Sequence, residues 1–474
     1  MSDEQILIWT RDFNSGSYIT NGWKMWYNGY NNEKLKLYLN NHRPDLMQNQ
    51  TLRELYSPLL GPYSQPYLKC VEDLSTNEKP FYYPIAIPWW VDARLLKDSV
   101  EIEDFILEQI KKNKAKILLY NNEEQWGFDY WKILIDTIID HYKDLTYDDF
   151  VVSCNNPKVS NLKSVPGYHN QFTPDNNFGW WQNASEMWTA LSEKITNPVP
   201  NELNGDGSRP FKFVCLLRRP SPIRWALSAE LLDYRLKGEA LLSMSCDVQE
   251  IQQNGPVFEN LEDGYYNYMR NRHWVGSKCL IPEHDLALHL YPGVAEKLIN
   301  YDHHYPFWIG NDVNPLTNPA SGDSAIWKFT DSYLHVVSET LFSDVPWGPQ
   351  EWVPDCRYYD QGVCLSEKIY KPIYYMQPFV VFGSPNTLSS LKEMGYKTFD
   401  TWIDESYDEI FDYELRFNKA IASVKEFANN SANDLDRIMQ EMLPVLQHNT
   451  DVLTKNKKNY HTDFVKSANA MLLS

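Results

Sequence analysis

The amino-acid sequence predicts an α/β fold with two domains. Short apolar runs typical of buried strands alternate with stretches of helical periodicity, which is the pattern of a parallel sheet. The chain has 474 residues, a length that favours more than one domain. Residues 196–210 contain three prolines and two glycines, so we interpret them as the interdomain linker. The predicted parts are an N-terminal domain of residues 1–205, a C-terminal domain of residues 206–425 and closing helices over residues 426–474.

The N-terminal domain begins with a short apolar run, residues 6–9, that is typical of a strand. An amphipathic helix is then predicted from the helical spacing of Ile102, Phe105, Ile106 and Ile110. Farther along, two strand candidates flank a second helix, whose apolar face carries Trp131, Leu134, Ile135, Ile138 and Tyr142. These strands are residues 116–120 and 150–153. A strand, a helix and a second strand of these lengths predict a βαβ unit and hence a parallel sheet.

The C-terminal domain repeats this alternation. Its predicted strands are residues 211–217, 241–245, 333–337 and 379–382, and a helix over residues 223–236 follows the first of them. The order predicts a doubly wound sheet. A closing helix is predicted from apolar positions between Leu435 and Leu446, with Asn433 as its N-cap.

The stretch from residue 365 to residue 400 organises the C-terminal domain. Ser366 is the expected cap of a helix, and Pro372 is expected to bend or interrupt it because proline lacks a backbone N–H donor. After the strand at residues 379–382, Asn386 or Thr387 is the expected cap of a further helix. Gly395 should end that helix in the left-handed conformation.

Charge and cysteine content narrow the class of protein. The net charge of 44 minus 63, or −19, disfavours a surface that grips polyanions throughout, although a local basic site fits within it. Seven cysteines without a C-x-x-C pair predict neither a disulfide framework nor a zinc site. No apolar run approaches the length of a membrane span, and no secretion signal is visible, so we expect a cytoplasmic protein.

Basic residues follow two of the predicted strands in the C-terminal domain. The first loop offers Arg218, Arg219 and Arg224, and the second offers Lys368 and Lys371 beside Glu367. Both loops belong at the carboxyl ends of parallel strands, where ligands bind in open α/β sheets and helix N-termini attract anions. A diphosphate suits this set, because arginine presents forked donors and lysine a compact charge. Solvated surface charges paired with the excess carboxylates are the alternative.

Carboxylates accompany these cations. Glu339 and Glu367 both fall at strand ends, and binding of a ribose or an ion pair with a neighbouring lysine are the two interpretations of Glu367. The acidic run from Asp400 to Asp412 is most simply a solvated face. No metal site is predicted.

The N-terminal domain carries carboxylates after its strand at residues 116–120. Glu124 and Asp129 are the candidate catalytic residues there, because one of them could act as general base for an acceptor hydroxyl. A helix-capping role is the alternative for each.

Several motifs together resemble a known family. Residues 213–224 read Phe-Val-Cys-Leu-Leu-Arg-Arg-Pro-Ser-Pro-Ile-Arg, residues 337–340 read Val-Ser-Glu-Thr, and residues 365–373 read Leu-Ser-Glu-Lys-Ile-Tyr-Lys-Pro-Ile. With Gln377-Pro-Phe379 and Gly395-Tyr-Lys-Thr-Phe399, this set resembles a family of phage and giant-virus glycosyltransferase-like proteins. That family is distantly similar to fucosyltransferases of the GT-B fold, and the similarity covers about residues 210–450.

The resemblance implies a metal-independent glycosyltransferase with two Rossmann-like domains facing a central cleft. It implies that Arg218, Arg219 or Arg224 and Lys368 contact the diphosphate of a nucleotide-sugar donor, and that Glu367 contacts the ribose. The donor is a co-substrate, and no separate cofactor is implied. Residues 1–200 match no motif, and we expect them to select the acceptor.

Three acceptor classes stay open: a glycan, a small molecule, or a modified base of phage DNA, which would place the protein in the host cytoplasm. The alternative function is a catalytically silent relative, a carbohydrate-binding or virion-associated protein, because a fold alone does not establish an activity.

Overall fold

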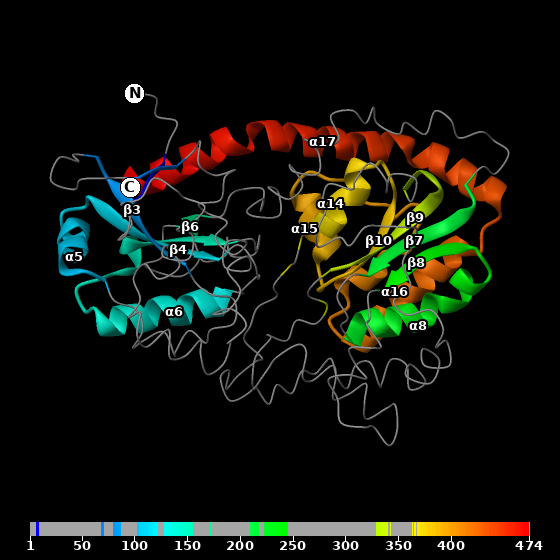
Figure 1. The fold of residues 1–474 in the computed structure, drawn as a ribbon, viewed down its shortest axis with the longest axis horizontal. Helices are drawn as coiled ribbons and strands as arrows, with labels where there is room; N and C mark the ends of the chain where they lie inside the picture. Colours follow the sequence, from blue (N-terminus) through cyan, green and yellow to red (C-terminus); the bar gives the residue numbers. More distant parts are fainter. Residues whose placement is uncertain are drawn as a thin grey trace, which may run out of the picture. The chain divides into compact units, whose positions relative to one another are not determined.

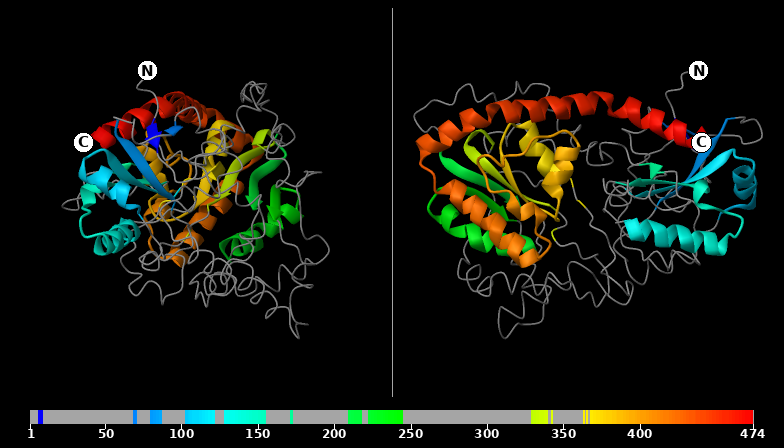
Figure 2. Two further views of the ribbon diagram at one scale, coloured as in Figure 1. Left: turned by 60° about the vertical axis from the view of Figure 1, so that its left-hand side comes forward. Right: turned by 180° about the vertical axis from the view of Figure 1, so that it is seen from behind.

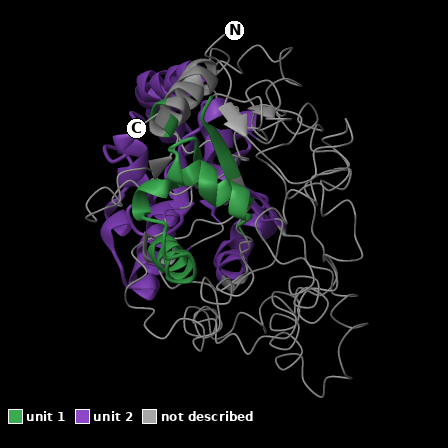
Figure 3. Ribbon diagram, turned by 90° about the vertical axis from the view of Figure 1, so that its left-hand side faces the viewer, with its two compact units in different colours: residues 1–183, 351–362, 456–474 green, residues 184–350, 363–455 purple. Residues whose placement is uncertain are grey.

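The structure, a computed structural model, divides the chain into two compact units (Figures 1 and 3). Unit 1 comprises residues 1–183, 351–362 and 456–474, and unit 2 comprises residues 184–350 and 363–455. The described residues are 6–8, 68–70, 79–86, 102–121, 128–154, 171–172, 209–217, 222–244, 329–339, 342, 363, 365 and 367–473.

Unit 1 contains a parallel sheet. Its strands in the described part are β1 (Ile6–Ile8), β2 (Leu68–Cys70), β3 (Phe81–Ala86), β4 (Ala115–Asn121), β5 (Phe150–Cys154) and β6 (Gln171–Phe172). Their order across the sheet is β2-β1-β3-β4-β5-β6, and each of these neighbouring pairs is parallel. The predicted βαβ unit is confirmed as β4, α6 (Phe128–His141) and β5.

The helices of unit 1 are positioned by apolar stripes. α6 buries Trp131, Leu134, Ile135 and Ile138 as predicted. The hydroxyl of Tyr142, just beyond this helix, accepts a hydrogen bond from the backbone N–H of Ile102 at 2.8 Å. The predicted helix at residues 102–110 is α5 (Asp104–Lys111). Its expected apolar face is wrong at one position, because Phe105 is 37% exposed while Ile102, Ile106 and Ile110 are buried.

Unit 2 contains a second parallel sheet. Its described strands are β7 (Phe211–Leu217), β8 (Ala240–Met244), β9 (Ser332–Ser338) and β10 (Phe379–Phe382), in the order β10-β9-β7-β8. Every residue of β9 and β10 is buried, as expected of strands covered on both faces. The predicted α/β class with two Rossmann-like units is therefore confirmed. The central cleft of the GT-B arrangement stays a prediction.

Helices lie on both faces of this sheet (Figure 2). Ser338 and its register partner Phe382 face α8 (Pro222–Leu236) and α16 (Tyr413–Ala428), because Arg224 contacts Ser338 and Phe417 packs on Phe382. Tyr333 faces the opposite way and binds Asp436 of α17 (Ala432–Leu473). The same face is covered by α14 (Glu367–Tyr374), which contacts β9 and β10. The sheet is doubly wound.

Two helices, α14 and α17, differ from the prediction. Pro372 lies inside α14 and does not interrupt it. The closing helix α17 begins at Ala432, where the hydroxyl of Ser431 accepts a hydrogen bond from the N–H of Asp434 at 3.2 Å, so Ser431 is its cap and the expected cap Asn433 is wrong. The helix also continues past Pro444 to residue 473, far beyond the predicted apolar stripe.

The predicted linker falls on residues 196–210, of which 196–208 lie outside the described residues. Arg209, next to them, is half-buried. It donates hydrogen bonds to the carbonyl oxygens of Phe329 and Ser332 at 3.0 and 2.6 Å, and its guanidinium lies over the ring of Tyr333. No helix in the described part of the chain is long and apolar enough to cross a membrane.

Candidate functional site

The candidate site lies where the strand order of unit 2 reverses. From β7 the chain builds β8 on one side, and β9 then pairs with the other side of β7. The carboxyl ends of β7 and β9 are therefore neighbours, while the described helices that follow them, α8 and α14, lie on opposite faces of the sheet (Figure 1). Such a topological switch point is the usual ligand-binding position in open α/β sheets.

Arg224 comes to this point from the first turn of α8. Its Nε donates to the hydroxyl of Ser338 at 3.4 Å, and its Nη2 donates to the carbonyl oxygen of the same residue at 3.5 Å. The side chain is 8% exposed. Burial raises the pKa of the neighbouring Cys215 thiol, and the positive charge of Arg224 opposes this shift. Arg224 therefore places a cation beside the last residue of β9.

Glu339 follows β9 directly and is fully buried. Its backbone N–H donates to the carbonyl oxygen of Phe382 at 3.0 Å, which extends the pairing of β9 with β10 by one residue. Its Oε2 lies 3.7 Å from Nζ of Lys368 on α14. A buried carboxylate requires such a partner, because an unpaired charge is strongly disfavoured away from water.

Lys368 is the more accessible member of this pair, since its side chain is 23% exposed while that of Glu339 is 0% exposed. Arg224 and Lys368 thus approach two successive residues, Ser338 and Glu339, from different helices. This arrangement brings together three of the predicted donor-binding residues. Arg224 reaches the end of β9 from the face that α8 covers, and Lys368 reaches it from the face that α14 covers.

Lys371 lies one helical turn beyond Lys368. Its charge acts on His335, in the middle of β9. Burial is the main cause that lowers the pKa of His335 to about 3, and the positive charge of Lys371 is the second cause. His335 is neutral near pH 7 as a result. Lys371 therefore acts on the middle of β9, and its predicted role in donor binding stays a prediction.

The other predicted site residues are less fully described. Arg218, Arg219 and Glu124 lie outside the described residues. Glu367 is the first residue of α14 and Asp129 is the second residue of α6, but their side chains lie outside the described part. Their roles stay predictions.

The loop between β10 and α15 (Thr387–Glu393) borders Glu339, because it begins immediately after Phe382. This loop is tightly built. The hydroxyl of Thr387 donates to the carbonyl oxygen of Ser384 at 2.6 Å, and a Cβ on Gly383 would lie only 2.9 Å from Oγ1 of Thr387. Gly383 is therefore required by a close approach, which the sequence indicated only as a turn.

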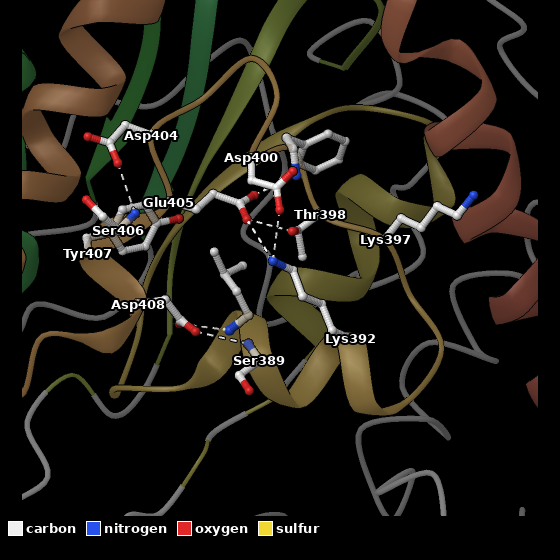
Figure 4. Close-up of polar contacts among 12 residues, drawn as sticks. Ser389, Lys392, Lys397, Thr398, Asp400, Asp404, Glu405, Ser406, Tyr407 and Asp408 are labelled. Atoms are coloured by element: carbon white, nitrogen blue, oxygen red, sulfur yellow. Dashed lines mark hydrogen bonds and ion pairs between the residues drawn. The ribbon is translucent and has the colours of Figure 1, made fainter.

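Asn386, one of the two expected caps, occupies the N-cap position of α15 but does not cap the helix with its side chain. Asn386 has a left-handed φ of 63° and makes no side-chain cap, while Gly395 ends the helix with φ +90° as predicted. The cap comes instead from Asp408, whose Oδ1 accepts from the N–H of Leu388 at 2.8 Å and whose Oδ2 accepts from that of Ser389 at 3.0 Å (Figure 4).

The acidic run that contains Asp408 is only partly a solvated face. Asp408 is 6% exposed, and the Glu405 side chain is 8% exposed. Glu405 accepts from the hydroxyl of Thr398 at 2.6 Å and from the N–H of Phe399 at 2.5 Å. Burial raises the pKa of both carboxyls, and these hydrogen bonds partly offset the shift. The sequence contains no local sign of this role, because Asp408 caps a helix whose first turn lies 20 residues earlier in the chain.

Comparisons with solved structures give distant matches. An α,α-trehalose 6-phosphate synthase from Burkholderia multivorans is 9% identical, with a TM-score of 0.35 over 93% of this chain and 82% of that one. A structure described as trehalose-6-phosphate from E. coli bound with UDP-2-fluoro glucose is 12% identical, with a TM-score of 0.39 over 99% and 90%. Similarity at this level does not establish a function. No protein-family model matches the chain, and no curated protein matches its sequence.

Proposed function

We propose that the protein is a glycosyltransferase that moves a sugar from a nucleotide-diphosphate donor to an acceptor hydroxyl. The observation that supports this proposal most directly is the position of Arg224 and Lys368, which flank Ser338 and Glu339 at the switch point of unit 2. Two cations that approach from different helices suit a diphosphate better than a single phosphate, because they can contact separate phosphoryl groups.

The chemistry gives these cations a role in the transition state. Cleavage of the bond between the sugar and the diphosphate builds negative charge on the leaving group. Fixed positive charges stabilise that charge without reorganising, and their effect is strongest where water is excluded. Arg224 is nearly buried, so its charge is held in such surroundings. We propose that Arg218 and Arg219, in the loop before α8, complete the cationic set and that no metal ion is needed.

The carboxylates have separate proposed roles. Glu339 holds Lys368 in place through their ion pair. Glu367, at the start of α14, is proposed to bind the ribose of the donor. Glu124 or Asp129 is proposed as the general base that accepts the proton of the attacking hydroxyl. The phage and giant-virus family that the motifs resemble is consistent with these roles.

The donor site is tested by thermal unfolding with a panel of nucleotide-diphosphate sugars. A ligand at about 100 times its dissociation constant adds about 2.7 kcal/mol, which raises the midpoint measurably. Lys368→Ala should abolish the increase. Lys237→Ala is the matched control, because Lys237 is an exposed lysine that follows the last residue of α8, at the opposite end of that helix from Arg224. A panel without any response in the folded wild type would contradict the proposal. An equal response in both variants would remove Lys368 from the site.

The acceptor is tested next, by measuring release of the nucleoside diphosphate with glycans, small hydroxyl compounds and DNA that carries hydroxymethylated bases. We propose that one of these classes accelerates release above the rate with water alone. If DNA is the acceptor, its affinity should fall steeply with salt, because binding to phosphates releases counterions. Sugar binding without turnover for every acceptor would favour a catalytically silent carbohydrate-binding protein.

A further inference from the structure

The turn that contains Asp408 and the loop that borders the candidate site are bound to each other by three hydrogen bonds. Two are the side-chain bonds to the first turn of α15. The third joins the backbone carbonyl oxygen of Asp408 to the N–H of Asn386 at 2.7 Å. One residue thus holds both the end of the β10–α15 loop, residues 383–386, and the start of the helix that follows it.

Asp408 supports the loop from outside it. Asn386 adopts a left-handed conformation that residues other than glycine seldom adopt, and its own side chain does not cap the helix. The first N–H groups of a helix have no partner within the helix, so they need an acceptor from elsewhere. Asp408 supplies it. The described bonds from Thr387 to Ser384 and from Ser390 to Asn386 stay within the loop and its own helix, so they do not fix the loop to the rest of the unit.

Asp408 is itself held firmly (Figure 4). It lies in a short 3-10 turn, η8 (Ser406–Glu409). The adjacent Tyr407 is buried, and its hydroxyl accepts from the backbone N–H of Val381 on β10 at 3.2 Å. Asp404 precedes the turn and accepts from the N–H of Ser406 at 3.0 Å, while its carboxylate lies 2.7 Å from Nζ of Lys419 on α16. The turn is therefore anchored to a strand and to a helix.

The supported loop adjoins the functional residues. The carbonyl oxygen of Phe382, the residue before Gly383, accepts the backbone hydrogen bond of Glu339. Glu339 in turn pairs with Lys368. A shift of the loop would therefore reach Glu339 through the single hydrogen bond between Phe382 and Glu339. Glu339 would in turn pass the shift to Lys368.

We infer that Asp408 is a positioning residue for the donor site: it fixes the β10–α15 loop at the end of β10 and so sets the place of Glu339 and Lys368. This inference rests on the proposed function. Asp408 acts through the backbone of residues 383–389 and does not touch the donor. Its loss should weaken donor binding and leave acceptor binding unchanged.

The test compares Asp408→Asn and Asp408→Ala with Asp412→Asn. Asp412 is the matched control, because its carboxylate also caps a helix, α16, by accepting from the N–H of Leu415 at 2.8 Å, and it makes no described contact with α15. Hydrogen exchange at the amides of Leu388 and Ser389 reports on the loop, and the KM values for donor and acceptor report on the site. We expect Asp408→Asn to speed exchange at the amide that loses its acceptor and to raise the donor KM about tenfold, while alanine speeds exchange at both amides and has a larger effect on KM. Asp412→Asn should change neither, because asparagine is as good a cap as aspartate for α16.

Each outcome of this test has a separate meaning. Should Asp408→Ala fail to fold, Asp408→Asn still decides, because asparagine keeps an acceptor for one of the two N–H groups. Faster exchange with an unchanged donor KM would overturn the inference and leave the proposed function intact. Unchanged exchange would overturn it as well. A wild type that binds no nucleotide sugar would overturn the proposed function, and the inference with it.

Discussion

Tyr333 of β9 donates its hydroxyl hydrogen to Oδ1 of Asp436 on α17, with 2.7 Å between the two oxygens. The residues are 103 positions apart in the chain, and both are at least nine-tenths buried. Arg209 lies over the same tyrosine ring, with 5.7 Å between its guanidinium carbon and the ring centre. This group ties the closing helix to β9, one of the two central strands in the described sheet of unit 2, on the face opposite Arg224 and Ser338.

Tyr333→Phe should lower the free energy of unfolding by about 1–2 kcal/mol, because a buried carboxylate loses a hydrogen-bond donor while the ring is kept. Urea unfolding followed by tryptophan fluorescence measures the change. Tyr234→Phe is the control, since Tyr234 also packs in unit 2, against Phe213, but no hydrogen bond of its hydroxyl is described. Equal effects of the two substitutions would show that the bond to Asp436 contributes nothing specific.

Arg224→Lys should weaken binding of a nucleotide-diphosphate sugar about tenfold although the positive charge is kept, because lysine lacks the forked donors of arginine. Isothermal titration measures the dissociation constant. Arg235→Lys makes the same exchange near the other end of α8, where Arg235 donates to the carbonyl oxygen of Leu242 at 2.6 Å. That control should leave donor binding unchanged. Wild-type affinity in Arg224→Lys would mean that Arg224 acts only through its charge or not at all.

Gly383→Ala should destabilise the protein by about 1–3 kcal/mol, because the new Cβ would lie 2.9 Å from Oγ1 of Thr387. The cost should be much smaller in a Thr387→Ala background, where that oxygen is absent. A double-mutant cycle of unfolding free energies measures the coupling. Gly238→Ala serves for comparison, since Gly238 has φ +73° and no neighbour within 4 Å, so its cost is backbone strain that Thr387→Ala cannot relieve. Strict additivity at Gly383 and Thr387 would contradict the close contact.

Asp404 should make stability depend on pH in the acid range. The hydrogen bond from Lys419 is the first of the causes that lower the pKa of Asp404 to about 2. A carboxyl whose pKa is depressed by folding contributes stability above its unfolded value of about 4, and this contribution is lost as the pH falls toward about 2. The difference in thermal midpoint between wild type and Asp404→Asn should therefore be constant above about pH 5 and shrink below about pH 4.

Lys419→Met provides the control for this pH dependence. Without the lysine, the pKa of Asp404 should return toward its ordinary value. The difference in thermal midpoint between the Lys419→Met variant and the double variant that also carries Asp404→Asn should therefore vary less with pH. A difference between wild type and Asp404→Asn that stays constant from about pH 5 to about pH 2 would show that the ion pair with Lys419 does not form in solution.

The sequence by itself determined the α/β class and most of the strands. Continuous apolar runs such as residues 379–382 predict strands buried on both faces, and β9 and β10 are buried in this way. The apolar stripe of α6 and the left-handed Gly395 were also predictable, because helical periodicity and glycine conformation are local properties. At the candidate site, the sequence identified Arg224, Glu339 and Lys368 as residues that follow strands.

The tertiary structure alone decided which of these residues meet. Ser338 joins Arg224 to the site because β7 and β9 are neighbours, although the two residues are 114 positions apart. Asp408, and not Asn386, caps α15 for the same reason: a helix N-terminus accepts any suitable carboxylate that packing brings to it. Local sequence patterns indicate which secondary structure a segment prefers. Pairings between distant segments depend on how the whole unit packs, and that information is spread over the chain.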